Sequence, residues 1–138
     1  MFTFLVLASS LRLRSRDVRY LTKKRNYFVK GGFGFFYYPQ YSNRPFHQFS
    51  CHITIKLSKH ATKRNLLKRM VMNTLRQQNA PHLAIHHQFY KIFIVLDKNN
   101  LTYLQTLVQN KEKNLTRLVQ QAFLSAFTSF QSFLCSKK

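Results

Sequence analysis

The spacing of apolar residues changes from a strand period to a helix period within residues 53–78. Ile53, Ile55 and Leu57 alternate with polar residues, which predicts a half-buried strand. Residues 62–78 follow a helical period, and the predicted apolar face consists of Leu66, Leu67, Met70, Val71 and Thr74. The opposite face of this predicted helix is rich in Lys and Arg, and Met72 and Leu75 lie toward it.

A shorter helix is predicted upstream, over residues 16–24. Ser15 can cap its first turn, and Asp17 stands where the helix dipole favours a negative charge. Val18, Leu21 and Thr22 share one face of this helix, whereas helical spacing directs Tyr20 elsewhere.

Residues 27–49 are rich in aromatic side chains and predict two strands. The aromatic content favours a strand over residues 33–38, after a turn at Gly31 and Gly32. Pro39 ends this strand, and residues 40–45 favour a hairpin connection to a partner strand over residues 46–57. Strand alternation places Phe36 and Tyr38 on one face of the sheet.

The rest of the chain predicts one more strand and a long helix. Residues 89–96 form an apolar run of strand length, which favours a central position in a sheet. Residues 101–134 follow a helical pattern, interrupted near residues 110–114. Its apolar stripe predicts a core-facing surface made of Leu115, Leu118, Val119, Ala122, Phe123, Ala126, Phe127 and Phe130. This order of elements predicts an α+β single domain over residues 12–138.

Charge narrows the choice of partner. The 138 residues include 23 Lys and Arg but only 3 Asp and Glu, a formal net charge of +20. Because 45% of the residues are hydrophobic, the chain can build a core and disorder is not expected. The charge therefore favours a polyanionic partner, with nucleic acid ahead of an anionic membrane. A run without any acid contains Lys56, Lys59, Lys63, Arg64, Lys68, Arg69 and Arg76.

Few residues are available for catalysis or metal binding. The acids are too scattered for paired acid–base chemistry, and they are Asp17, Asp97 and Glu112. Three histidines lie near one another without a Cys, Asp or Glu beside them, so we interpret them as loop residues and not as zinc ligands: His82, His86 and His87.

The cysteines and the N-terminus indicate an intracellular protein. Cys51 and Cys135 suggest no disulfide framework, and we expect two buried or half-buried thiols in a reducing cytoplasm. The apolar run from Phe2 to Ala8 is too short for a membrane span and lacks the basic start of a signal peptide. Residues 1–11 are expected to be a tail or extra strand, or translated sequence upstream of the true start.

The basic stretch also resembles a known family. Ser58-Lys59, then Lys63-Arg64-Asn65 and Lys68-Arg69, are similar to the S-x-S-K-K and R-N-R-x-K-R signature of the protein subunit of bacterial ribonuclease P. Arg12-Leu13 and Asp17 resemble that family's opening R-L-x-x-x-x-D-F-x-x-V-F. Leu66 stands where the family most often has a second Arg. Val18 and Thr22 stand where it usually has phenylalanines.

The resemblance implies an αβββαβα sandwich with a left-handed crossover at the basic helix, which periodicity alone does not show. It implies an RNA-binding subunit of the endoribonuclease that removes the 5′ leader of precursor tRNA. The implied partners are the catalytic ribonuclease P RNA and precursor tRNA. Mg²⁺ is then expected to be held mainly by RNA and substrate, with no catalytic or metal-binding residue in the protein.

The resemblance also implies which residues meet RNA. The residues that would bind the catalytic RNA are Asn65 and the Lys and Arg residues of the run without any acid: Lys56, Lys59, Lys63, Arg64, Lys68, Arg69 and Arg76. The 5′ leader would lie in a cleft lined by Arg16, Val18, Arg19, Thr22, Phe36, Tyr38, His52 and Thr54. Phe36 could be a stacking platform there, or a core residue covered by the first helix.

Two other functions are compatible with the charge. A structural RNA-binding protein of ribosomal type is one, and only the Lys63-Arg64-Asn65 and Lys68-Arg69 motif argues against it. A membrane-surface protein is the other. Its basic helix would need larger apolar anchors than Leu67, Met70 and Val71, which the core also requires.

Overall fold

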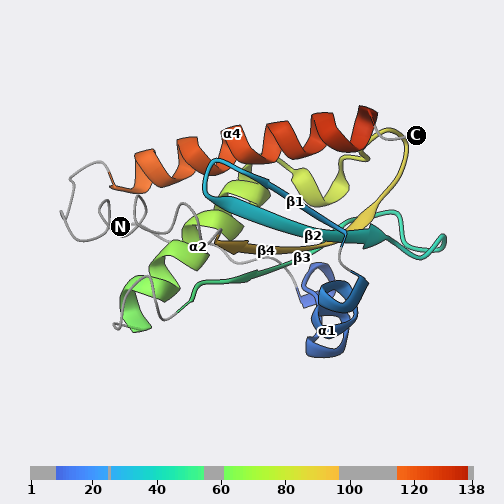
Figure 1. Ribbon diagram of the computed structural model, residues 1–138, viewed down its shortest axis with the longest axis horizontal. Coiled ribbons are helices and arrows are strands. Elements are labelled where there is room, and N and C mark those ends of the chain that lie inside the picture. Colours follow the sequence, from blue (N-terminus) through green and yellow to red (C-terminus); the bar gives the residue numbers. More distant parts are fainter. Residues whose placement is uncertain (1–8, 25, 55–60, 97–114, 137–138) are drawn as a thin grey trace.

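The computed structural model describes residues 9–24, 26–54, 61–96 and 115–136, which form one sheet flanked by helices (Figure 1). The elements in chain order are η1 (Ser9–Leu11), α1 (Ser15–Lys24), β1 (Tyr27–Lys30), β2 (Phe33–Pro39), β3 (Gln48–His52), α2 (Ala61–Gln77), η2 (Ala80–His82), β4 (Tyr90–Leu96) and α4 (Leu115–Ser136). Both η elements are short 3-10 helices. The order of the longer elements confirms the predicted αβββαβα arrangement. Residues 97–114, the first part of the predicted C-terminal helical region, lie outside the described ranges.

Strand β4 lies inside the sheet, whose strand order is β1-β2-β4-β3. It pairs antiparallel with β2 and parallel with β3. Its alternating residues are buried on both faces, with Ile92 and Ile94 on one side and Lys91 and Phe93 on the other. A mostly apolar run is what such a doubly covered strand requires. The central position predicted for residues 89–96 is therefore confirmed.

The predicted hairpin between residues 33–38 and 46–57 is wrong. β4 separates β2 from β3, and β2 forms its hairpin with β1 instead. That hairpin turns at Gly31 and Gly32, whose positive φ angles of 61° and 88° are readily adopted by glycine. β3 is also shorter than predicted and ends at His52. The more apolar β4 takes the interior position between the two strands, where it is covered on both faces.

A crossover occurs at the basic helix. β3 and β4 run parallel and are connected through α2. Parallel neighbours need such a connection, because a tight turn can join only antiparallel strands. The left-handed sense of this crossover stays a prediction, and residues 55–60 lie outside the described ranges.

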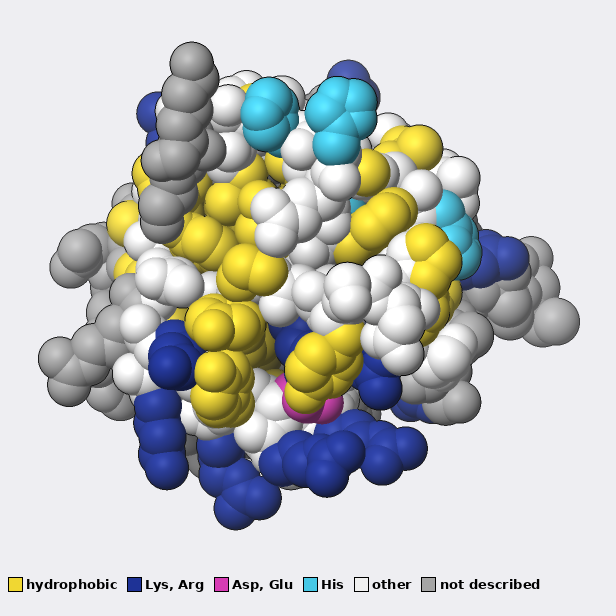
Figure 2. Space-filling model, turned by 90° about the vertical axis from the view of Figure 1, so that its right-hand side faces the viewer, with side chains coloured by type: hydrophobic (Ala, Val, Ile, Leu, Met, Phe, Trp, Pro, Cys, Tyr) yellow, Lys and Arg dark blue, Asp and Glu magenta, His cyan; other side chains and the backbone are white. Residues whose placement is uncertain are grey.

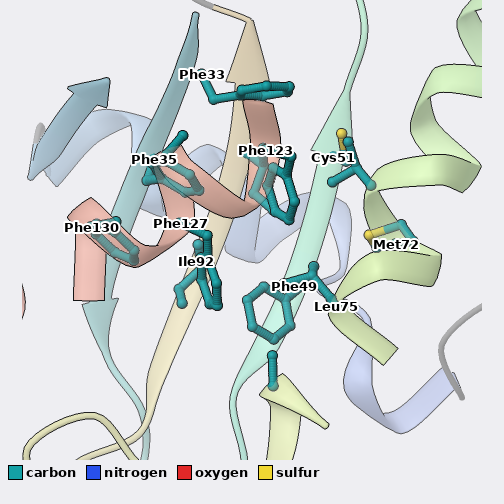
Figure 3. Packing of buried hydrophobic residues seen from close by; sticks show 14 of the residues in the cluster. Phe33, Phe35, Phe49, Cys51, Met72, Leu75, Ile92, Phe123, Phe127 and Phe130 are labelled. Atoms are coloured by element: carbon teal, nitrogen blue, oxygen red, sulfur yellow. The ribbon is translucent and has the colours of Figure 1, made fainter. Parts of the chain in front are cut away.

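The core lies between one face of the sheet and the helices α2 and α4 (Figures 1 and 3). Phe33, Phe35 and Tyr37 of β2 point into it, and Phe35 stacks on Phe130 with a centroid separation of 4.7 Å. The buried stripe of α4 consists of Val119, Phe123, Ala126, Phe127, Phe130 and Leu134. The phenylalanines of this helix are therefore core residues, as predicted.

Helix α2 is buried more widely than its pattern predicts. Leu67, Met70, Val71 and Thr74 are buried as expected, whereas Leu66 is 37% exposed. Met72 and Leu75, placed toward the charged side by periodicity, are buried too. The second half of α2 packs against α4, η2 and β3, so neighbours cover it from several directions. None of the described helices is both long enough and apolar enough to cross a membrane.

The two cysteines differ in environment. Cys51 is buried on the core side of β3, and burial raises the pKa of its thiol to about 12. Its thiol therefore stays protonated and unreactive near neutral pH. Cys135 is exposed near the end of α4, so the expectation that both thiols are at least half-buried is wrong for this one. Both thiols are free.

The chain before α1 is attached to the sheet. Leu11 packs against the core, and the side-chain amide of Gln48 donates a hydrogen bond to the Ser10 carbonyl. The Leu13 amide donates to the Phe49 carbonyl, in a bridge that pairs Arg12 with Phe49. The predicted tail, residues 1–11, thus overlaps a segment that is part of the domain, while residues 1–8 lie outside the described ranges.

A buried histidine joins the start of β3 to the loop before β4. His47 is 0% exposed, and its Nδ1 accepts a hydrogen bond from the Tyr90 amide at 2.8 Å. Its Nε2 donates to the Leu83 carbonyl at 2.7 Å, which requires the neutral tautomer protonated at Nε2. Burial lowers the pKa of His47 despite these two backbone hydrogen bonds. The sequence did not single out this residue.

His47 should therefore make stability depend on pH. An unfolded chain takes up a proton on this histidine near pH 6.5, whereas the folded chain resists it, so stability should fall as pH drops below about 6.5. The free energy of unfolding should fall by up to about 1.4 kcal/mol per pH unit between pH 6.5 and 5. His47→Gln should be less stable at pH 7 but show a flatter dependence in urea titrations. Parallel slopes for the two proteins would contradict this account.

Candidate nucleic-acid interface

The sheet face opposite the core carries a row of aromatic side chains. Tyr27 of β1 pairs with Phe36 of β2, which pairs with Phe93 of β4, which in turn pairs with Ser50 of β3. Directly paired residues share a face of the sheet. The ring centroids are 4.6 Å apart between Tyr27 and Phe36 and 6.1 Å apart between Phe36 and Phe93. We call Tyr27, Phe36 and Phe93 the aromatic row.

The rings of the row differ in accessibility. Tyr27 is exposed, Phe36 is half-buried and Phe93 is just buried. Tyr27 also lies over Gly34, where an added Cβ would collide with its ring, so glycine leaves room for this tyrosine. Part of the Tyr27 and Phe36 surface is thus accessible to a flat ligand. The ring contacts of Phe36 are with Tyr27 and Phe93, which favours the stacking-platform interpretation over burial beneath the first helix.

Helix α1 covers the neighbouring row of the same face, formed by Tyr38, Lys91 and Gln48. Lys91 Nζ contacts Asp17 Oδ1 at 2.9 Å, and the two side chains are only 6% and 17% exposed. Partial burial alone would raise the pKa of Asp17, but hydrogen bonds from Lys91 and from the Arg14 amide lower it below its ordinary value. The pair therefore fixes α1 across the sheet beside the aromatic row.

The C-terminal part of α1 contacts the sheet through tyrosines. Tyr20 packs edge-on against Tyr38 at 5.2 Å, with Lys24 Nζ 5.2 Å from the Tyr20 ring. A hydrogen bond between the two phenols lowers the pKa of Tyr20 and raises that of Tyr38. The expectation that Tyr20 points elsewhere is therefore wrong. Leu21 is the fully buried residue of the helix, so its neighbour Tyr20 lies at the edge of the covered face.

The other predicted cleft residues are less close together than expected. Val18 is half-buried, and Thr22 is exposed with its hydroxyl donating to the Arg19 carbonyl. His52 and Thr54 were expected on a strand next to Phe36, but β4 lies between, so the distance across is about two strand spacings, or roughly 10 Å. His52 still shares the face of Phe36. Phe93 contributes a ring to this face, but the sequence pattern did not predict it. It appeared there only as one apolar residue of the strand predicted over residues 89–96.

A basic hollow of about 830 Å³ extends this surface beyond β3. It lies between residues 10–14, strand β3 and helix α2. Its lining consists of Ser10, Arg12, Leu13, Arg14, Phe49, Ser50, Asn65, Lys68, Arg69 and Met72. Since Ser50 is the next residue in line after Phe93, the aromatic row runs toward this hollow. We call it the basic hollow.

The structure brings together part of the predicted RNA-binding set. Asn65, Lys68 and Arg69 are exposed on one stretch of α2 and line the basic hollow. Lys63 and Arg64 are half-buried in the first turn of α2, and Arg64 Nε has no hydrogen-bond partner among the described residues. Arg76 is exposed near the other end of the helix, roughly 16 Å from Asn65 along its axis. Lys56 and Lys59 lie outside the described ranges.

The described surface is almost free of negative charge. Asp17 is the acid within the described ranges, and Lys91 occupies one of its carboxylate oxygens. Figure 2 shows Lys and Arg side chains gathered along one edge of the molecule around an acidic side chain. The described residues contain no cluster of three His, Cys, Asp or Glu that could hold a metal ion. Positive side chains beside accessible aromatic rings suit the binding of an anionic chain with exposed bases.

Comparisons with known proteins identify the fold. No family model and no curated protein matches the sequence. The structure is similar to a Staphylococcus aureus RNase P protein mutant with defective mRNA degradation activity, with a TM-score of 0.66, 14% identity, and coverage of 88% of this chain and 89% of that one. It is similar to the Thermotoga maritima RNase P protein in complex with 1-(4-fluorophenyl)-2-thiourea, with a TM-score of 0.61, 18% identity, and coverage of 83% and 94%.

These matches confirm the predicted resemblance at the level of the fold. They cover most of this chain and nearly all of the matched chains. The chain therefore has the fold of bacterial RNase P proteins. The residues that bind RNA stay a prediction.

The placement of α1 can be tested through its ion pair. Asp17→Asn should leave the ammonium of Lys91 buried without a charged partner and destabilise the protein by about 3 kcal/mol. Adding Lys91→Met should restore part of the loss, because Met fills the space of the lysine stem without a charge. Chemical denaturation of both single variants and the double variant gives the coupling energy. A coupling near zero would show that the pair does not hold α1.

Proposed function

We propose that this protein is the RNA-binding subunit of a ribonuclease P. It binds the catalytic RNA and the 5′ leader of precursor tRNA, and so promotes endonucleolytic removal of the leader. The observation that carries the proposal is the aromatic row leading into the basic hollow, on the fold of bacterial RNase P proteins. The lack of membrane-spanning helices among the described residues is compatible with the cytoplasmic location proposed for this complex.

The two parts of the surface suit two parts of a single-stranded leader. Unstacked bases can lie on Phe36 and Tyr27, because aromatic stacking tolerates every base. Phosphates can pair with Arg12, Lys68 and Arg69 in the basic hollow. A leader varies in sequence between tRNAs, so contacts that do not read bases are what its recognition requires.

Helix α2 is proposed to face the catalytic RNA. Its exposed Lys and Arg have no carboxylate among the described residues to neutralise them, since Asp17 is engaged by Lys91. Such a face gains the release of counterions when it binds an RNA backbone. Asn65, with amide donors and an acceptor, adds hydrogen-bonding capacity where α2 meets the hollow.

Among the described residues, the oxygen ligands available do not fit a magnesium site. Mg²⁺ prefers carboxylate and phosphate oxygens. Asp17 has one oxygen bonded to Lys91 and the other to the Arg14 amide. The proposal therefore assigns Mg²⁺ and the catalytic centre to the RNA subunit and substrate, and assigns positioning and charge neutralisation to the protein.

A structural RNA-binding protein of ribosomal type is the alternative, since the charge and the fold would serve it equally. Reconstitution decides between them. The purified protein, combined with the RNase P RNA of the same organism and precursor tRNA at low Mg²⁺, should increase cleavage at the mature 5′ end. Co-purification with ribosomes and no effect on cleavage would favour the alternative.

Phe36 tests the leader contact. Phe36→Ala removes the central ring of the aromatic row and should weaken binding of leader-containing precursor tRNA about fivefold to more than a hundredfold. Affinity for mature tRNA should change far less, because mature tRNA has no leader. Fluorescence titrations with the protein–RNA complex measure both affinities.

Phe36→Leu is the matched variant for that experiment. It keeps an apolar side chain of similar bulk but lacks the aromatic face, so it should retain thermal stability better than Phe36→Ala while losing much of the leader affinity. Equal losses for precursor and mature tRNA would rule out the leader contact, even if the protein still activates cleavage.

Lys68 and Arg69 test the phosphate contacts. Each replacement by Gln should weaken RNA binding to a similar extent for all RNA sequences and make the salt dependence of log Kd shallower by about one unit. Arg117→Gln is the control, because Arg117 is exposed on α4, across the core from the aromatic row. A salt dependence that responds equally to all three substitutions would mean that only net charge matters.

A further inference from the structure

A second basic hollow, of about 300 Å³, lies beyond the end of strand β2. Tyr41, Arg44 and Phe46 of the β2–β3 loop line one side, and the chain before and at the start of α1 lines the other. The aromatic row lies in the opposite direction, because Phe36 precedes Tyr38, whose row is covered by α1. This hollow is therefore separate from the aromatic row, although Ser10, Arg12 and Arg14 also line the basic hollow. We call the second hollow the arginine pocket.

The charge of the arginine pocket is unusual for so small a space. Four arginines line it, Arg12, Arg14, Arg16 and Arg44, together with the single acid Asp17. Lys91 neutralises that carboxylate. Like charges held this close repel one another unless an anion binds between them.

The pocket wall is held by specific hydrogen bonds. The Gln48 side chain donates to the Ser10 carbonyl and accepts hydrogen bonds from Gln40 Nε2 at 3.0 Å and Arg44 Nη1 at 3.2 Å. Gln48 is buried, so it fixes the N-terminal segment and the loop in one arrangement. The buried Gln48 thus links Arg44 to the N-terminal segment that carries Arg12 and Arg14, which limits the rearrangement needed to bind a shared ligand.

Tyr41 indicates that the ligand is a phosphate and not a base. Its ring is 57% exposed, but Lys91 Nζ lies 4.1 Å and the Arg44 guanidinium 5.0 Å from its centroid. The tyrosine thus orients cations rather than offering an unoccupied stacking surface. A guanidinium stacked on an aromatic ring keeps N–H donors at its edge, in the fork geometry that matches phosphate oxygens.

We propose that the arginine pocket is a binding site for backbone phosphates of a folded RNA, on the other side of α1 from the aromatic row. It reads no bases and needs no unpaired strand. The inference deepens the proposed function, because it rests on RNA being the ligand. It adds a site outside both the aromatic row and helix α2.

Duplex RNA of arbitrary sequence is the probe, since its paired bases cannot stack on the aromatic row and any backbone contact of helix α2 is the same in every variant compared. The full chain is titrated with fluorescently labelled duplex RNA over a range of KCl concentrations. Arg44→Gln and Arg16→Gln should each weaken binding about three- to tenfold at low salt and make the salt slope shallower by about 0.9. Arg117→Gln should lower affinity much less. Thermal melting checks that the variants remain folded.

The result that would overturn the site is an unchanged affinity and slope for both Arg44→Gln and Arg16→Gln, or losses no larger than that of Arg117→Gln. Binding to anionic phospholipid vesicles that these substitutions abolish, with duplex RNA binding intact, would also overturn it. Because the probe is unrelated to tRNA processing, failure here leaves the cleavage and leader experiments unaffected.

Two further titrations identify which RNA occupies the site. Loss of affinity for the catalytic RNA alone places the pocket against that subunit, and loss for mature tRNA places it against the body of the substrate. Either loss supports phosphate binding in the pocket. If neither RNA is affected by Arg44→Gln or Arg16→Gln, the pocket is not an RNA site of the complex and the inference fails.

Discussion

The open face of the sheet depends on one buried charge. Lys91 lies in an interior strand, and its ammonium group would cost several kcal/mol there without a partner. Helix α1 supplies that partner through Asp17, while Tyr41 adds its ring face. The helix is thereby held over the row of Tyr38 and Lys91 and not over Phe36. This single placement leaves the aromatic row accessible on one side of α1 and the arginine pocket on the other.

Local patterns in the sequence predicted most of the elements, but they missed strand β1 (Tyr27–Lys30) and did not predict how the strands pair. The periods of α2 and α4 and the apolar run of β4 predict the helices, the core stripe and the central strand, because each pattern reflects burial of the element that carries it. The wrong hairpin has a different origin. Whether β3 pairs with β2 or β4 is decided by the burial of β4, which lies far along the chain from both.

The candidate site shows the same division. The acid-free face of α2 came from local sequence and the choice of Phe36 from the resemblance to the ribonuclease P family, and the structure places Lys68 and Arg69 beside one hollow. Phe93 could not be told apart from the other apolar residues of 89–96. The sequence does not show which face of this strand α1 leaves uncovered, because that depends on where α1 packs. His47 was missed for a related reason. Its two hydrogen-bond partners are backbone groups of Leu83 and Tyr90, and hydrogen bonds to the backbone leave no pattern of side chains in the sequence that could predict them.

The departures from the family pattern on α1 become intelligible from the sheet. Val18 and Thr22 stand where the resemblance predicts phenylalanines, so Tyr20 is the aromatic side chain that α1 places against the sheet. The sheet supplies further aromatic surface, through Tyr27, Phe36 and Phe93 in neighbouring strands. The hydrogen bonds between paired strands fix the strands relative to one another, and so they also fix the relative positions of the rings that the strands carry, more than a single helix would. The rings thus form one continuous row on the sheet, while α1 supplies charge, through Asp17 toward Lys91 and through its exposed arginines toward the outside.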